Sequence, residues 1–115
     1  MNVTQEPNSG IAIDSQTAAV TTATLAAPGV GFKWRVTAVS ASFSGAAVAT
    51  PVRATLTLNG QVLGRGVSTN DGWQQSFIAP LESADNGTVV LSMPSGGAGA
   101  VGDLIVAAVK VKTGG

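Results

Sequence analysis

The sequence predicts an all-β fold, a single antiparallel β-sandwich or jelly-roll-like barrel with an extended N-terminal arm. No segment carries a sustained helical period, several short segments alternate apolar and polar residues, and turn signals such as Asn59-Gly60 and Asn86-Gly87 recur roughly every 10–15 residues. At 115 residues the chain fits one domain. The pattern does not distinguish an open sandwich from a closed barrel.

Residues 1–17 are predicted to form the arm, and residues 18–115 the β-sandwich domain. The arm is mostly polar, and it carries Pro7 and three sizeable apolar residues, Val3, Ile11 and Ile13. Such a segment has too little apolar surface to pack as an element of its own. We expect it to become ordered on a partner, by strand addition or groove docking, with disorder in the free protein as the alternative.

The first strand is predicted over residues 18–25, because AVTTATLA is rich in β-branched residues and is followed by the turn dipeptide Pro28-Gly29. The second covers residues 32–44, FKWRVTAVSASFS, and changes character halfway. Phe32, Trp34 and Val36 share one face, but further on the apolar set shifts by one residue. A β-bulge near Ala38 would shift the faces in this way.

The third strand, Val52–Leu58, alternates cleanly and predicts Val52, Ala54, Leu56 and Leu58 as inward residues. Asn59-Gly60 predicts a tight hairpin into residues 61–63. Residues 64–72 are expected to form a loop, residues 73–78 a strand closed by Pro80, residues 88–93 a strand, and residues 95–100 a glycine-rich tip. The last strand, residues 103–112, is continuously apolar and is therefore expected at the centre of a sheet.

Composition argues against catalysis, so we expect no enzyme activity, no cofactor and no metal. The chain has no His, Cys or Tyr, which removes the usual general base, the thiol nucleophile and the commonest metal ligands. Glu82 and Asp85 could form an acidic pair for calcium or glycoside chemistry, but they lie in a turn-rich segment where carboxylates cap the backbone. Six Lys plus Arg balance six Asp plus Glu without clustering, so nucleic acid is not an expected partner. No segment is long and apolar enough to predict a membrane span, and the N-terminus does not resemble a signal peptide.

Two groups of residues are candidates for a contact surface. The first is the set of arm residues Val3, Pro7, Ile11 and Ile13. The second is the region from Arg65 through Asn70 to Trp73, where an exposed indole could stack on a sugar, although the core is the favoured place for Trp73 and for Trp34.

The strands KWRVTAVSASFSG, VRATLTLNGQVL and NGTVVLSMPSGGAGAVGDLIVAAV, rich in small residues and Asn-Gly turns, resemble those of small β-sandwich, jelly-roll-like head decoration or cement proteins of tailed bacteriophages. The resemblance implies a virion protein made in the host cytoplasm that binds the outside of the capsid, often as a trimer. It implies the major capsid protein as partner, whose subunits such a protein bridges to stabilise the head.

Two other classes stay open. One is a phage fibre-tip or tail adhesion module whose residues 66–73 touch a host saccharide. The other is a small jelly-roll coat subunit, although residues 1–17 carry no Lys or Arg, and coats that package nucleic acid usually have a basic arm.

Overall fold

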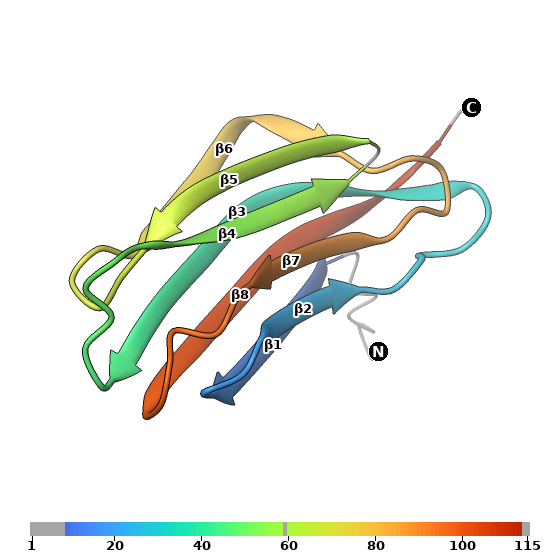
Figure 1. The fold of residues 1–115 in the computed structure, drawn as a ribbon. Helices are drawn as coiled ribbons and strands as arrows, with labels where there is room; N and C mark the ends of the chain where they lie inside the picture. The colour runs from blue at the N-terminus through green and yellow to red at the C-terminus, as the bar shows by residue number, and fades with distance from the viewer. Residues whose placement is uncertain (1–8, 59, 114–115) are drawn as a thin grey trace, which may run out of the picture.

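The computed structural model describes residues 9–58 and 60–113, and every regular element in these ranges is a β-strand (Figure 1). This confirms the predicted all-β class. The strands of the described residues are β1 (Ser9–Thr17), β2 (Thr21–Leu25), β3 (Phe32–Gly45), β4 (Val52–Leu58), β5 (Gln61–Val67), β6 (Trp73–Glu82), β7 (Val89–Met93) and β8 (Ala100–Lys112).

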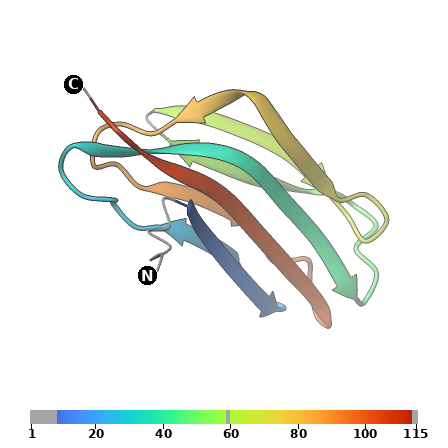
Figure 2. The same ribbon diagram turned by 180° about the vertical axis from the view of Figure 1, so that it is seen from behind.

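The strands form two antiparallel sheets stacked face to face (Figures 1 and 2). Sheet A has the order β1-β8-β3-β6, and sheet B has the order β2-β7-β4-β5. Strand β1 pairs with β8, β2 with β7, β3 with β6 and β4 with β5, so the chain is a nested hairpin rolled into two sheets. This is the strand order of a jelly-roll-like sandwich. Of the two architectures that the sequence did not distinguish, the structure is therefore the sandwich and not the closed barrel.

The core lies between the sheets and is built from the alternating inward positions of both. Leu56, Leu58 and Leu91 of sheet B and Leu104 and Val106 of sheet A are at most 1% exposed. Burial of an aliphatic side chain of this size contributes about 1.5–3 kcal/mol. The inward positions predicted for β4 are confirmed, and β8 lies in the interior of sheet A, as its continuous apolar sequence predicted.

The change of character in β3 is a β-bulge, as predicted. The register of β3 against β8 pairs Val36 with Ala108 and Ala38 with Ala107, so Thr37 is an extra residue without a partner in the ladder. Val36 before the bulge is 0% exposed and Val39 after it is 3% exposed. The bulge therefore keeps both halves of a long strand facing the same core.

The hairpin at residues 59–60 is confirmed, because Leu58 pairs with Gln61 and Gly60 has a φ of +73°. The prediction that a loop begins at residue 64 is wrong, because β5 continues through Gly64 and Gly66 to Val67. A Cβ at Gly64 would collide with the Arg53 guanidinium. Glycine at this position makes room for a cross-strand side chain rather than ending the strand.

Strand β6 also runs further than predicted, through Pro80 to Glu82. Its ladder with β3 pairs Ser76 with Ala38 and Leu81 with Val36, so residues 77–80 bulge out opposite Thr37. Strand β6 is an edge of sheet A, and proline is tolerated in an edge strand because the outer edge needs no ladder hydrogen bond there.

The largest correction concerns the arm, because Ser9–Thr17 is not outside the domain but forms β1, the other edge of sheet A. Its inward positions carry small residues, Gly10 and Ala12, while Ile11 and Ile13 face outward at 64% and 68% exposed. The Trp34 ring fills the space at Gly10, where a Cβ would lie 2.6 Å from Cη2. Because the pairing partner lies about 90 residues away along the chain, local composition gave no sign of it.

Candidate interaction surface

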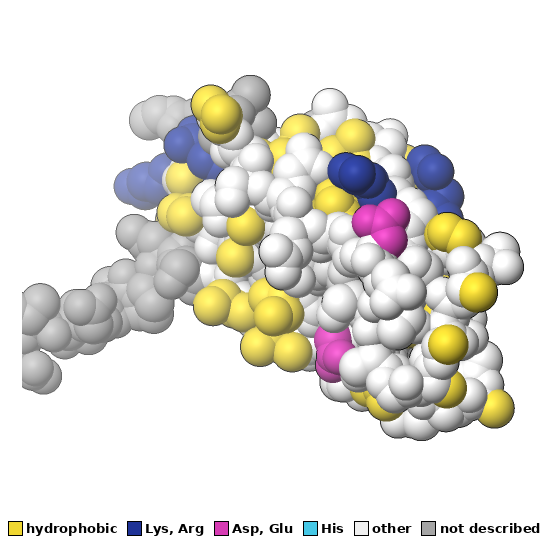
Figure 3. All heavy atoms as spheres, turned by 90° about the vertical axis from the view of Figure 1, so that its left-hand side faces the viewer, with side chains coloured by type: hydrophobic (Ala, Val, Ile, Leu, Met, Phe, Trp, Pro, Cys, Tyr) yellow, Lys and Arg dark blue, Asp and Glu magenta, His cyan; other side chains and the backbone are white. Residues whose placement is uncertain are grey.

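The outer face of sheet A carries a contiguous apolar patch over β1 and β8, which we call the isoleucine face. It is formed by Ile11 and Ile13 of β1 and by Ile105 and Ala107 of β8. In the ladder Ile11 pairs with Ala107 and Ile13 with Ile105, so these side chains are direct neighbours on one surface. In Figure 3 hydrophobic side chains gather at the lower left, on the side where this end of sheet A lies.

Exposure of these residues is energetically unfavourable in the isolated chain. Full burial of an isoleucine contributes about 1.5–3 kcal/mol, and Ile11, Ile13 and Ile105 remain 64%, 68% and 41% exposed. Single exposed apolar residues are common, but a contiguous group of them marks a contact surface.

The rest of the face is uncharged near its middle. The row through Ile13 and Ile105 continues to Ser40 and Gln74, and the row through Ile11 and Ala107 continues to Ala38 and Ser76. The hydroxylated half of β3 therefore supplies small side chains to this part of the outer face of sheet A. The charged side chains of the outer face of sheet A lie beyond these two rows, with Asp103 toward one end of the strands and Arg35 toward the other.

The outer face of sheet B is more polar on β2 and β4, although Val62 of β5 and Val90 of β7 also face outward there. Its outward residues on β2 and β4 are Thr22, Thr24, Arg53, Thr55 and Thr57. Threonine is a good strand former and its hydroxyl is readily hydrated, so threonine-rich positions are typical of a sheet face that contacts water.

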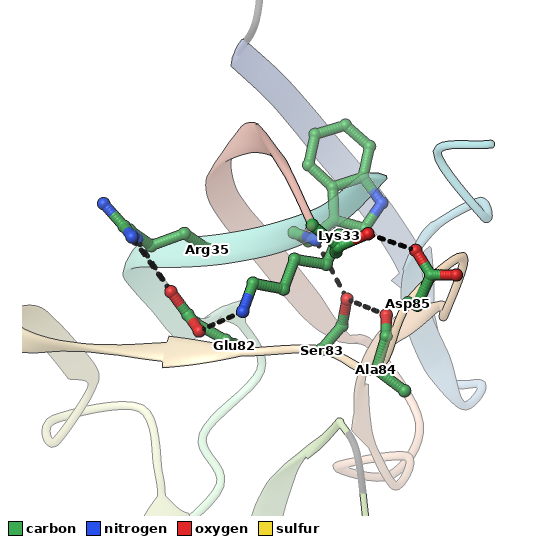
Figure 4. Close-up of polar contacts among 8 residues, drawn as sticks. Lys33, Arg35, Glu82, Ser83, Ala84 and Asp85 are labelled. Atoms are coloured by element: carbon green, nitrogen blue, oxygen red, sulfur yellow. Dashed lines mark hydrogen bonds and ion pairs between the residues drawn. The ribbon is translucent and has the colours of Figure 1, made fainter. Parts of the chain in front are cut away.

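A polar cluster joins the end of β6 to the start of β3 (Figure 4). The Glu82 carboxylate lies 2.6 Å from Lys33 Nζ and accepts hydrogen bonds of 3.1 and 3.0 Å from Nε and Nη2 of Arg35. The hydrogen bond with Lys33, and then that with Arg35, lowers the pKa of Glu82 below its ordinary value. This cluster clamps the edge strand just after its bulge.

The segment after Glu82 is a corner held by side-chain caps. Ser83 is 3% exposed, its N–H donates to Trp34 O at 2.8 Å, and its Oγ accepts from Trp34 N at 2.9 Å (Figure 4). Asp85 Oδ1 accepts from Gly31 N at 3.1 Å and from Thr113 Oγ1 at 2.8 Å. Glu82 and Asp85 therefore make strand and turn contacts, as the sequence favoured.

Asp14 also has a structural role. Its Oδ2 accepts from the backbone N–H of Thr22 at 2.9 Å, and its Oδ1 accepts from Gln16 Nε2 at 2.9 Å. The hydrogen bond from Thr22, followed by that from Gln16, lowers the pKa of Asp14. The carboxylate thus connects β1 of one sheet to the start of β2 in the other.

The second group of predicted contact residues does not come together as one surface. Arg65 and Asn70 are exposed, on β5 and on the β5–β6 connection. Trp73 is 2% exposed and its Nε1 donates to Gln75 Oε1, so its indole is part of the core and not of a contact surface. Trp34 is half-buried, and its Nε1 donates to Ala26 O at 2.8 Å. Val3 and Pro7 lie outside the described residues.

The exposed apolar residues that were not predicted include Ile105 and Ile78. The sequence does not show that Ile105 is exposed, because β8 is apolar on both faces. In the structure Ile105 lies between the buried Leu104 and Val106 and therefore faces the outer side of sheet A. Ile78 is 100% exposed because it lies in the β6 bulge. The bulge is visible in the pairing of β6 with β3 and could not be predicted from the sequence of β6 alone.

Among residues 9–58 and 60–113 there is no cluster of three or more carboxylate, His or Cys side chains with metal-binding geometry, and no pocket is found. The part of the chain that the structure describes also contains no helix able to cross a membrane. No protein-family model matches this chain, and no curated protein matches it either.

Proposed function

We propose that the chain is a non-enzymatic virion structural protein, a capsid decoration or cement protein that binds the outer shell as a homo-oligomer. The isoleucine face supports the homo-oligomeric part of this proposal, because an exposed apolar surface, with no pocket found among the described residues, is suited to contact with protein. The jelly-roll-like strand order agrees with the resemblance to phage decoration proteins, since capsid proteins are among those that use it.

The proposed role is mechanical. A protein of this kind bridges neighbouring subunits of the major capsid protein, so that separating them requires its release as well. A standard interface buries on the order of 1,600 Å², and oligomerisation multiplies weak contacts through effective concentration. The proposed location is the capsid surface, after synthesis in the host cytoplasm.

The roles of the ionisable residues support a non-enzymatic protein. Asp14, Glu82 and Asp85 each accept hydrogen bonds that join strands or corners. With no His, Cys or Tyr in the sequence, general acid–base chemistry would depend on such carboxylates.

The fibre-tip module has less support, because it needs an indole open to a sugar. Trp73 is buried, and the Trp34 ring packs at Gly10 and Leu25. The coat subunit has less support because residues 1–17 contain no Lys or Arg.

The test uses heads of the phage that encodes the chain, prepared without it. Purified protein is mixed with these heads, the heads are sedimented, and bound protein is quantified. We expect saturable co-sedimentation and a rise in the temperature at which the heads rupture. Protein that stays in the supernatant at every concentration would contradict the proposal.

The same assay locates the contribution of the N-terminus. Removing residues 1–8 leaves β1 complete, because β1 begins at Ser9, so the fold should persist while shell binding weakens. Removing residues 1–17 deletes β1 and is expected to destabilise the sandwich itself. Full occupancy by the 1–8 deletion would show that this segment does not contribute to binding.

A further inference from the structure

The isoleucine face is a contiguous apolar surface that the fold itself does not use. Figure 2, which views the molecule from the side of sheet A, shows no other described element over it. We propose that this face binds a second copy of the chain, related by a two-fold axis that lies in the contact plane and crosses the strands. The contact forms between free protein molecules and does not depend on a shell.

A two-fold contact needs a self-complementary surface, because each copy offers the same patch to the other. The middle of the isoleucine face lies at the pairing of Ala12 with Val106, halfway between the rows of Ile11 and Ile13. Rotation about this point places the Ile13–Ile105 row of one copy against the Ile11–Ala107 row of the other. Apolar side chains then meet apolar side chains over the whole centre.

One pair of opposite charges on the outer face of sheet A fits the same symmetry. Asp103 lies three residues from the midpoint Val106 in one direction, and Val109, which pairs with Arg35, lies three residues away in the other. Each is about 10 Å from the axis at a rise of about 3.3 Å per residue. The rotation therefore places Asp103 of one copy beside Arg35 of the other, twice per dimer.

Both charged groups keep hydrogen-bonding capacity for such a contact. Glu82 occupies Nε and Nη2 of Arg35, and among the described residues Nη1 has no acceptor. Ser15 Oγ donates to Oδ1 of Asp103 at 2.6 Å, and within the same residues Oδ2 has no donor. An Arg–carboxylate contact is favoured by this geometry of free donors and acceptors.

The whole outer face of sheet A, of which the isoleucine face is the apolar part, has the size of a stable contact. Four strands about 4.8 Å apart span about 19 Å, and the 13 residues of β8 span about 43 Å, which gives a projected area of up to about 800 Å² per copy. A standard interface uses about that area on each partner. The small side chains of Ala38, Ser40 and Ser76 allow the two sheets to approach to the usual spacing of about 10 Å.

The first experiment measures solution mass by sedimentation equilibrium over a range of concentrations. We expect a dimer for the natural protein and an increase in its dissociation constant on the order of 100-fold for Ile13→Ser, because each dimer loses two isoleucines from the contact. Val62→Ser is the matched control, since Val62 is 59% exposed on β5 and should leave the mass unchanged.

The second experiment reverses the charges, with thermal melts to confirm that every variant folds. Asp103→Arg and Arg35→Asp should each weaken the dimer by placing like charges together, and the double variant should restore it. Within one chain the two positions are about 20 Å apart along the strands, so only an intermolecular contact explains restoration.

A monomer at all concentrations, or the trimer that the phage resemblance implies, would overturn the inference. A dimer unaffected by Ile13→Ser would do the same, as would failure of the double variant to recover. Co-sedimentation with heads is measured separately, so failure of the two-fold contact can be told apart from failure of shell binding.

Discussion

Deletion of Thr37 tests the account of the β3 bulge. Val36 pairs with Ala108 and Ala38 with the next residue of β8, Ala107, so removing Thr37 leaves a regular ladder in which both flanks keep their faces. The loss is the hydrogen bond from Thr37 Oγ1 to Ala107 O, which contributes about 1 kcal/mol. We expect a folded protein whose melting temperature falls by about 4 °C.

Deletion of Thr55 is the matched control, because it removes an outward threonine from β4, which has no bulge to absorb the change. The faces must then invert on one side of the gap, which turns Leu56 and Leu58 outward or Val52 and Ala54 outward with Arg53 inward. Two buried leucines alone contribute about 4 kcal/mol, a large part of a typical total stability of about 5–15 kcal/mol.

The assay is thermal and urea unfolding followed by circular dichroism. We expect a cooperative transition for the Thr37 deletion and loss of the native transition for the Thr55 deletion. If the Thr37 deletion also failed to fold, the bulge would not be the device that aligns the two halves of β3.

Three further predictions concern the core, the edge strand and the clamp. Leu58→Asp should abolish folding, because an unpaired charge would replace a side chain that is 1% exposed, and a melt unchanged from the natural protein would show that the assigned face is wrong. Gly10→Ala should destabilise the protein by about 1–3 kcal/mol in urea unfolding, since its Cβ would press on the Trp34 ring, whereas equal stability would mean that β1 packs differently. The lowered pKa of Glu82 stabilises the fold above the ordinary glutamate pKa and ceases to do so as pH falls through the folded value, so the stability advantage over Glu82→Gln should shrink on acidification. A constant difference between the two proteins from neutral to acid pH would rule out that contribution.

Local patterns in the sequence were enough to predict most of the fold. The limits of β4 agree with the prediction, and the Asn-Gly signal placed the β4–β5 hairpin, because both depend on residues close together in the chain. The shift of apolar residues in β3 located the bulge for the same reason. The strand pairing that makes the sandwich jelly-roll-like is non-local, so it could not be derived from these patterns.

The missed features depend on distant neighbours. Ser9–Thr17 is mostly small and polar, so its own sequence does not indicate a strand. It forms one because it pairs with β8, which is distant in the sequence. The sequence pattern predicts a loop from Gly64, but the lack of a side chain at this position leaves room for the Arg53 side chain of the neighbouring strand. Ile11 and Ile13, which the sequence suggested as contact candidates, are exposed in the structure, whereas the exposure of their neighbour Ile105 was not predicted.

The central claim is that the protein acts by binding a capsid shell. Sedimentation of the natural protein with heads that lack it tests this claim, with the natural protein centrifuged without heads as the control for pelleting on its own. The natural protein should pellet with the heads at a fixed ratio to capsid subunits and should stay in the supernatant when heads are left out. Natural protein found only in the supernatant in the presence of heads, with its native melting transition intact, would contradict the account.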